Sequence, residues 1–177
     1  SLAKRQLDFG QLREVARGTT EITSMVFLIL IGASLFSLVF RGFGGEMMIE
    51  HALNQLPGGV LGAFLVVMLV IFLLGFILDF IEIIFVVVPI VGPILLAMGL
   101  DPIWLGVMIA LNLQTSFLTP PFGFSLFYLR GVTPRSVPTS TMYKGVIPFI
   151  GIQIAMLVIA YLWPDLITWL PEQVYGN

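Results

Sequence analysis

The sequence has no cysteine and a single histidine among its 177 residues. Without cysteine there can be no disulfide, thiol catalysis or thiolate metal site in this chain. One histidine, His51, argues against a histidine-based metal centre or a catalytic triad, and we expect it to be an exposed loop residue. The net charge is −2, and no basic or acidic run suggests nucleic-acid binding.

Charge of either sign is also scarce. Charged residues make up 10% of the chain and hydrophobic residues 58%, with a mean hydropathy of +1.06, whereas about a quarter of an ordinary globular domain is charged. Such a chain cannot cover a water-facing surface, so we predict an all-α integral membrane protein. The N-terminal stretch lacks the apolar core of a signal peptide and starts with Ser1. We therefore expect a fragment, a processed chain or one half of something larger.

Apolar runs and their polar boundaries divide the chain into segments, each bounded by charge, glycine or proline. We predict a cytoplasmic amphipathic or interfacial helix over 1–20, a transmembrane helix over 21–41, a periplasmic connection over 42–59, a helical hairpin over 60–100, a discontinuous transmembrane helix over 102–131 that is broken at 112–121, a cytoplasmic loop over 132–145, a transmembrane helix over 146–170 and a periplasmic tail over 171–177.

The predicted hairpin contains only two charges, Asp79 and Glu82. A single helix of about 40 residues would be about 60 Å long, twice the thickness of the hydrocarbon core. The chain must therefore fold back near Asp79. Hydropathy leaves open whether both arms cross the membrane or enter and return on the same side.

The stretch "LNLQTSFLTPPFGFSLFYLRG", residues 111–131, places amide and hydroxyl side chains directly before a Pro-Pro pair. Irregular backbone at membrane depth is tolerated only inside protein or beside a water-filled cavity. One interpretation is a proline kink whose freed carbonyls bond to Ser and Thr hydroxyls. We favour a binding site, because a broken helix offers carbonyls to a cation and N–H groups to an anion.

Asp79 supports the same interpretation, because an ionisable group at membrane depth costs about 2.5–3.5 kcal/mol and is functional by default. The alternative is a hairpin turn that reaches the cytoplasmic surface, where Asp79 is simply solvated. Glu82, one turn later, is a weaker candidate, for which the alternative role is to cap the second arm of the hairpin. Gly75 is expected to allow close helix approach.

Cations indicate the orientation. Lys and Arg residues precede the first predicted span and occupy the loop before the last one. The predicted crossings place both groups on the same side, which the positive-inside rule identifies as the cytoplasm. The N-terminus is then cytoplasmic and the C-terminus periplasmic.

The hairpin with an acidic tip, followed by "GLDP", "QTSFLTPPFGF" and "LFYLRGV", resembles the C-terminal half of the large, DctM-like membrane subunit of TRAP (tripartite ATP-independent periplasmic) transporters. The resemblance implies one inverted-repeat half of an elevator-type secondary transporter in the bacterial inner membrane. It further implies sodium-coupled import of an organic anion, with sodium as coupling ion and no other cofactor. The implied partners are a periplasmic substrate-binding protein, a small TRAP membrane subunit and the N-terminal half of the large subunit.

The resemblance also implies a sodium and substrate region at the hairpin tip and the helix break. Its sodium ligands would be Thr115, Ser116, Thr119 and nearby backbone carbonyls. Where the family commonly has small residues after "LD", this chain has bulky "LDFIEI", which could alter substrate preference. The full set of residues carried over is Gly75, Asp79, Asn112, Gln114, Thr115, Ser116, Thr119, Pro120 and Pro121.

Two alternative functions make different demands on these residues. A non-transporting, truncated membrane assembly or anchor component would need none of these polar residues. An intramembrane protease needs paired aspartates or a Ser/His arrangement, and Asp79 has no aspartate partner at membrane depth. We therefore expect a transporter component and not an enzyme.

Overall fold

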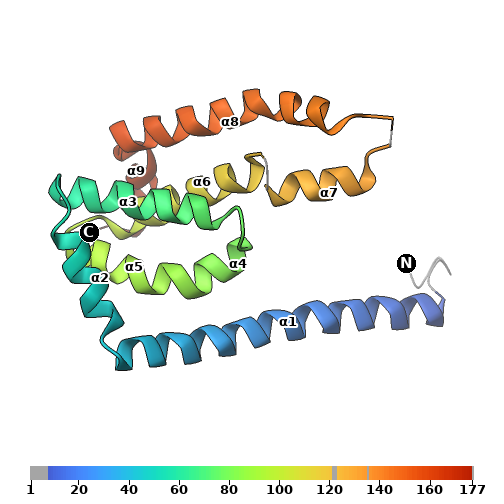
Figure 1. Cartoon of the computed structure of the whole chain (residues 1–177), viewed down its shortest axis with the longest axis horizontal. Helices are drawn as coiled ribbons and strands as arrows, with labels where there is room; N and C mark the ends of the chain where they lie inside the picture. The colour runs from blue at the N-terminus through green and yellow to red at the C-terminus, as the bar shows by residue number, and fades with distance from the viewer. Residues whose placement is uncertain (1–7, 121–122, 135, 177) are drawn as a thin grey trace.

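A computed structural model describes residues 8–120, 123–134 and 136–176, which form helices and turns and contain no strand (Figure 1). In chain order the helices are α1 (Phe9–Gly42), α2 (Gly45–Asn54), α3 (Gly59–Leu74), α4 (Phe80–Glu82), the π-helix η2 (Ile83–Val87), α5 (Val88–Ala97), α6 (Pro102–Leu118), α7 (Phe124–Val132), α8 (Thr139–Leu162) and α9 (Asp165–Tyr175).

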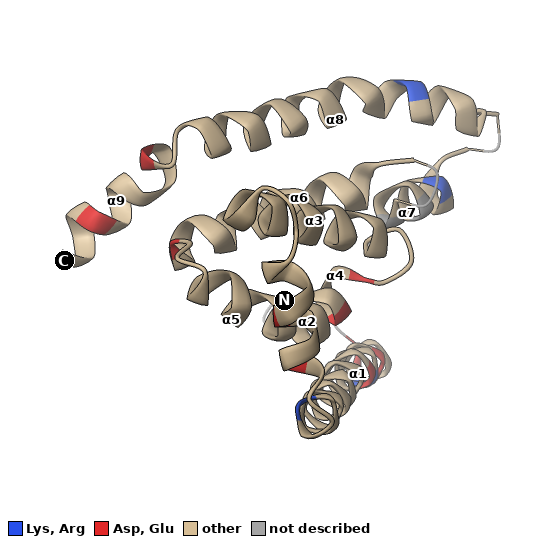
Figure 2. Ribbon diagram, turned by 60° about the vertical axis from the view of Figure 1, so that its left-hand side comes forward, with Lys and Arg blue, Asp and Glu red and all other residues tan. Residues whose placement is uncertain are grey.

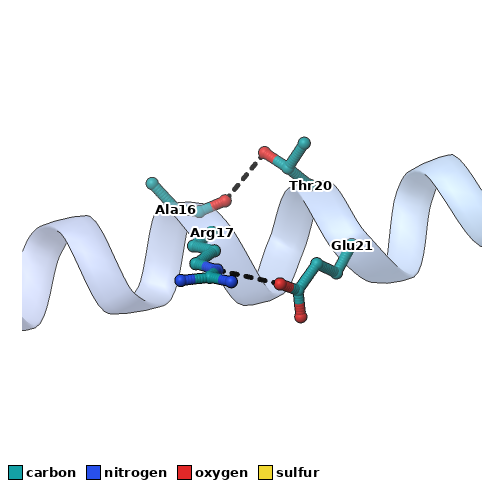
Figure 3. A network of polar contacts seen from close by, with 4 residues as sticks. All are labelled: Ala16, Arg17, Thr20 and Glu21. Carbon is teal, nitrogen blue, oxygen red and sulfur yellow. Dashed lines mark hydrogen bonds and ion pairs between the residues drawn. The ribbon is translucent and has the colours of Figure 1, made fainter.

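α1 is one helix of 34 residues, about 51 Å long. The sequence predicted an interfacial helix and a separate transmembrane helix here, and the structure joins them. Gly18 alone is too weak a helix breaker to separate them. The polar part is compatible with a helix because Arg17 Nε lies 2.9 Å from Glu21 Oε1, one turn away, and Thr20 Oγ1 donates to Ala16 O at 2.8 Å (Figure 3).

α3 leads into a turn at residues 75–79, from which α4, η2 and α5 run back. α3 has 16 residues, about 24 Å, less than half the length of α1. Figure 1 shows the turn beside the interruption between α6 and α7, part of the way along α1. The tip of this hairpin thus lies at the level of the helix break.

The second arm of the hairpin contains the π-helical turn η2, ahead of Pro89. A proline lacks the N–H that would bond to the carbonyl four residues earlier, and its ring clashes with that carbonyl. The wider turn relieves this conflict, and Val88 N bonds to Ile83 O.

α6 lies at the centre of the fold and packs against α3 on one side and α8 on the other. Trp104 on α6 packs on Phe64 of α3 and on Tyr161 of α8, with ring centroids 5.0 and 6.2 Å apart. Its indole Nε1 donates to Ala160 O at 2.9 Å in the buried core. Pro164 has no N–H for that carbonyl, so Trp104 supplies the donor that the helix lacks.

Among the residues that the structure describes, three helices are long and apolar enough to cross a membrane: α1, the continuous run Phe80–Ala97 and α8. α1 and α8 expose most of their apolar side chains, as expected of helices that face lipid or further protein. α8 extends from Thr139 to Leu162, so it starts inside the predicted loop 132–145 and ends before the predicted limit of 170. Pro138 favours helix entry and Pro164 ends the hydrogen-bond ladder, after which α9 begins.

Figure 2 shows basic residues on α7 and near the start of α8, and acidic residues on α9 and around α4. The N-terminal part of α1, α7 and the start of α8 lie at one end, with α2, the α5–α6 turn and α9 at the other (Figure 1). Arg13, Arg17, Arg130 and Lys144 belong to the first group of elements. Lys4, Arg5 and Arg135, which also entered the predicted orientation, lie outside the described residues.

Candidate functional site

The interruption of the sixth helix is shorter than the sequence predicted. α6 continues to Leu118, so Asn112, Gln114, Thr115 and Ser116 are helical, and the predicted break at 112–121 begins only at Thr119. Thr119 is extended, with φ −81° and ψ 127°, because a following proline disfavours the helical conformation. Pro120 is half-buried, and Pro121 lies outside the described residues.

A backbone amide and a serine hydroxyl replace the hydrogen bonds that the prolines remove. Pro120 and Pro121 carry no N–H for the carbonyls of Ser116 and Phe117. Thr119 N bonds to Ser116 O at 3.1 Å, and Ser125 Oγ donates to Phe117 O at 2.8 Å. The sequence reasoning did not identify Ser125, although a hydroxyl shortly after a Pro-Pro pair is the signal that could have found it.

The predicted site residues lie on different faces of α6. At 3.6 residues per turn, Ser116 lies about 40° around the helix from Asn112, whereas Gln114 lies about 200° away. Asn112 Nδ2 donates to Met68 O at 2.8 Å, on α3. Gln114 is exposed on the other face, where it lines a groove of about 290 Å³ with Phe80, Ile84, Ala110, Leu113 and Phe117.

Ser116 joins α6 to the end of α3. Phe76 N bonds to Leu73 O, so the Phe72 carbonyl lacks its usual donor from the fourth following residue. Ser116 Oγ donates to that carbonyl at 2.7 Å. Gly75 makes this approach possible, because a Cβ there would overlap the Ser116 hydroxyl and lie 2.9 Å from Ser116 Cβ. Gly75 and Ser116 are thus in direct contact.

The two threonines bond back to their own helix. Thr115 Oγ1 donates to Leu111 O and Thr119 Oγ1 donates to Thr115 O, both at 2.7 Å. Thr115 is buried and Thr119 is half-buried. Each hydroxyl oxygen keeps lone pairs after donating its hydrogen, so both threonines can still accept a cation or a donor.

Asp79 lies at the hairpin tip and is half-buried. It caps α4, with Oδ1 accepting from Phe80 N at 2.8 Å. Phe80 packs edge-on against Phe117 of α6, with ring centroids 6.2 Å apart, which brings the tip beside the end of α6. Within the described ranges, neither Asp79 nor Glu82 forms an ion pair.

α3 and α6 run parallel, because Asn112 and Ser116 bond to the carbonyls of Met68 and Phe72 with the same spacing of four residues. Both helices therefore end, with partial negative charge, at the same level. Hydroxyl oxygens and backbone carbonyls lie at this level, and Asp79 lies at the adjacent hairpin tip. Such oxygens suit a small hard cation more than a transition metal.

Histidine takes no part in this region. His51 is exposed, as the sequence predicted, but it lies on α2 and not in a loop, where Nε2 contacts Gln55 Nε2 at 2.8 Å. In the part of the chain that the structure describes, no cluster of three or more His, Asp or Glu side chains could hold a metal ion.

Comparison with known proteins gives a match to a family model. Residues 1–166 match the model described as "Tripartite ATP-independent periplasmic transporter, DctM component". The chain is 29% identical over 164 residues to the sialic acid TRAP transporter large permease protein SiaM of Vibrio cholerae, an overlap that covers 92% of this chain and 38% of SiaM.

Two further relatives have the same kind of name. The ectoine/5-hydroxyectoine TRAP transporter large permease protein UehC of Ruegeria pomeroyi is 27% identical over 176 residues, which are 99% of this chain and 41% of UehC. The C4-dicarboxylate TRAP transporter large permease protein DctM of Vibrio cholerae is 36% identical over 83 residues, which are 47% of this chain and 18% of that protein.

The chain spans about two fifths of the length of the relatives that it matches along most of its own length. No solved structure gives a significant match.

Proposed function

The chain belongs to the DctM component family of tripartite ATP-independent periplasmic transporters, and we propose that it forms the C-terminal half of a large permease subunit that imports an organic anion with sodium. The family consists of transporter permeases and not of enzymes. Its relatives include large permease proteins for C4-dicarboxylates and for sialic acid. These names support an organic acid as the substrate class.

One observation carries this proposal: the ends of α3 and α6 lie side by side at a hairpin tip, with polar side chains between apolar helices. Polar groups at membrane depth are costly and mark ligand pathways. Two parallel helix C-termini offer partial negative charge to a cation. The arrangement therefore supports a sodium site better than a purely structural kink.

Within this site we assign different roles to the polar residues. Ser116 and Asn112 hold the first arm of the hairpin on α6, because both donate to carbonyls of α3. Thr115 and Thr119, with the carbonyls at the end of α6, supply oxygen ligands for sodium. Gln114 faces the substrate through the groove that it shares with Phe80. Asp79 offers its carboxylate to the cation or to a hydroxyl group of the substrate, because a carboxylate would repel the anionic part of the substrate.

The proposed partners follow from the family and from the length of the relatives. A periplasmic binding protein delivers the substrate, and a small membrane subunit completes the complex. The N-terminal half of the large subunit covers the apolar surfaces that this half exposes. We propose that the hairpin is re-entrant. The N-terminal end of α1, with Arg13 and Arg17, lies in the cytoplasm of a bacterium, and α9 lies on the periplasmic side.

Uptake into proteoliposomes tests the proposal. A complete large subunit carrying this segment, with its small subunit and binding protein, should accumulate substrate under an inward sodium gradient but not under a matched potassium gradient. Asp79→Asn and Thr115→Ala should each reduce uptake at least tenfold, because each removes a proposed ligand group. Ile154→Leu, at an exposed position of α8, is the control and should transport normally.

Uptake that is independent of sodium would contradict the coupling mechanism. If both site variants transported at the wild-type rate, the alternative of a non-transporting assembly or anchor component would hold for this segment.

A further inference from the structure

A glutamine interrupts the face that α8 turns toward the core. The least exposed positions of this helix recur every three or four residues, which is the spacing of one helix face. Gln153 belongs to this stripe and, unlike its immediate neighbours on the stripe, is polar. The stripe consists of Met142, Val146, Ile150, Gln153, Leu157 and Ala160.

The packing of α8 against α6 fixes the level at which Gln153 lies. The two helices run antiparallel, since Trp104 bonds to Ala160 at one end and Asn112 lines a cavity of about 250 Å³ with Leu157 further along. Gln153 is one turn beyond Leu157 in the direction of the helix break. It therefore lies level with residues 111–116 of α6, which include the polar residues Asn112, Thr115 and Ser116.

The side-chain oxygen of Gln153 has no donor. In the part of the chain that the structure describes, Oε1 is buried and has no hydrogen-bond partner. A buried amide oxygen without a partner costs about 1–3 kcal/mol. In the middle of a membrane helix, bulk water cannot supply the missing bond.

The neighbouring hydroxyls of α6 cannot supply it either. Thr115 gives its only hydroxyl hydrogen to Leu111 O, and Ser116 gives its own to Phe72 O. Asn112 directs Nδ2 toward Met68 on α3. The hydroxyl donors at the level of residues 112–116 are therefore already used, and none of them bonds to Gln153 Oε1.

We propose that Gln153 is a further residue of the transport site, with Oε1 accepting an electropositive ligand between α6 and α8. That ligand is a sodium ion or an O–H or N–H group of the substrate, which share the same chemistry toward an amide oxygen. This inference rests on the proposed function and adds α8 to a site that the sequence had confined to the hairpin and α6.

The test uses the complete transporter in proteoliposomes and the substitution Gln153→Leu, with Ile154→Leu as the matched control on the adjacent, exposed position. The variant should raise either the half-saturating sodium concentration or the substrate KM about tenfold or more, as expected for a lost bond to a charged or donating ligand. A change in the sodium value identifies sodium as the ligand, and a change in KM identifies the substrate.

A second measurement separates this role from a structural one. In sodium-free buffer without substrate, Gln153→Leu should leave the Tm of the purified complex unchanged or raise it, because leucine removes an unpaired buried oxygen. A fall of several degrees, or a failure to fold, would mean that Gln153 has a partner within the protein and would overturn the proposal. A Gln153→Leu variant whose uptake depends on sodium and substrate as the wild type does would overturn the proposal as well. A wild-type complex that shows no sodium-driven uptake would instead contradict the proposed function.

Discussion

Gly75 lies at a close contact between the hairpin and α6, and Gly75→Ala tests whether that contact holds them together. The added Cβ would overlap the Ser116 hydroxyl and lie 2.9 Å from Ser116 Cβ. The backbone around Gly75 bonds to Ile71 O and continues α3, so it cannot easily move away. Ser116 must therefore rotate or shift, and the Phe72 carbonyl loses its donor.

The expected loss in the free energy of unfolding of Gly75→Ala has two causes. Forcing an extra carbon into a packed contact costs about 1–3 kcal/mol. Leaving a buried carbonyl unpaired costs a further 1–3 kcal/mol, roughly. Because moving Ser116 partly relieves the first term, we expect a total of about 2–4 kcal/mol. Gly106→Ala is the matched control, since a Cβ there meets nothing within 4 Å, and it should be neutral or slightly stabilising.

The free energy of unfolding of the purified large subunit in detergent measures both variants. Ser116→Gly in the Gly75→Ala background should recover part of the loss, because it makes room for the new methyl group, and the double-mutant cycle gives the coupling between the two positions. A Gly75→Ala variant within about 0.5 kcal/mol of the wild type would refute the close contact.

Two further substitutions test the bonds that replace those lost to proline. Trp104→Phe should lower the free energy of unfolding by about 1–3 kcal/mol, because Ala160 O loses its donor. The loss should be smaller in a Pro164→Ala background, where a backbone N–H is restored. An equal loss in both backgrounds would argue against this role of Trp104. Gly123→Ala should destabilise the α6–α7 connection, since a Cβ there would lie 2.7 Å from Phe117 O. Gly131→Ala is the control and should have no such effect, because a Cβ at Gly131 meets nothing within 4 Å. Equal Tm values for the two variants would contradict this expectation.

The sequence predicted an all-α membrane protein, because composition alone leaves no water-facing surface, and the structure confirms that class. It could not predict the extent of the helix break. Polar residues beside two prolines suggested unwinding, yet Asn112, Thr115 and Ser116 remain helical because their side chains bond to carbonyls of α3 or of their own helix. Those partners depend on tertiary packing, which a single sequence does not show.

The sequence also could not predict which face of α6 each site residue occupies. Assigning residues 112–121 to a break in the helix removed the periodicity that separates Gln114 from Asn112 and Ser116. The role of Gln153 was hidden for another reason: one glutamine in an apolar run has no local signal that tells a lipid-facing position from a buried one. Only the packing of α8 on α6 shows that its side-chain oxygen is buried.

The central claim is that the hairpin tip and the end of α6 form a hydrated ligand site at membrane depth. Because the chain has no cysteine, Gln114→Cys and Ile154→Cys can be labelled individually, provided that native cysteines elsewhere in the complex are first replaced. A hydrophilic maleimide should modify Gln114→Cys, in the groove beside Phe80, and sodium with substrate should slow the reaction. Ile154→Cys should stay unmodified, because the exposed face of α8 meets lipid or further protein and not water. Equal reactivity at the two positions, or no protection by sodium and substrate, would contradict the account.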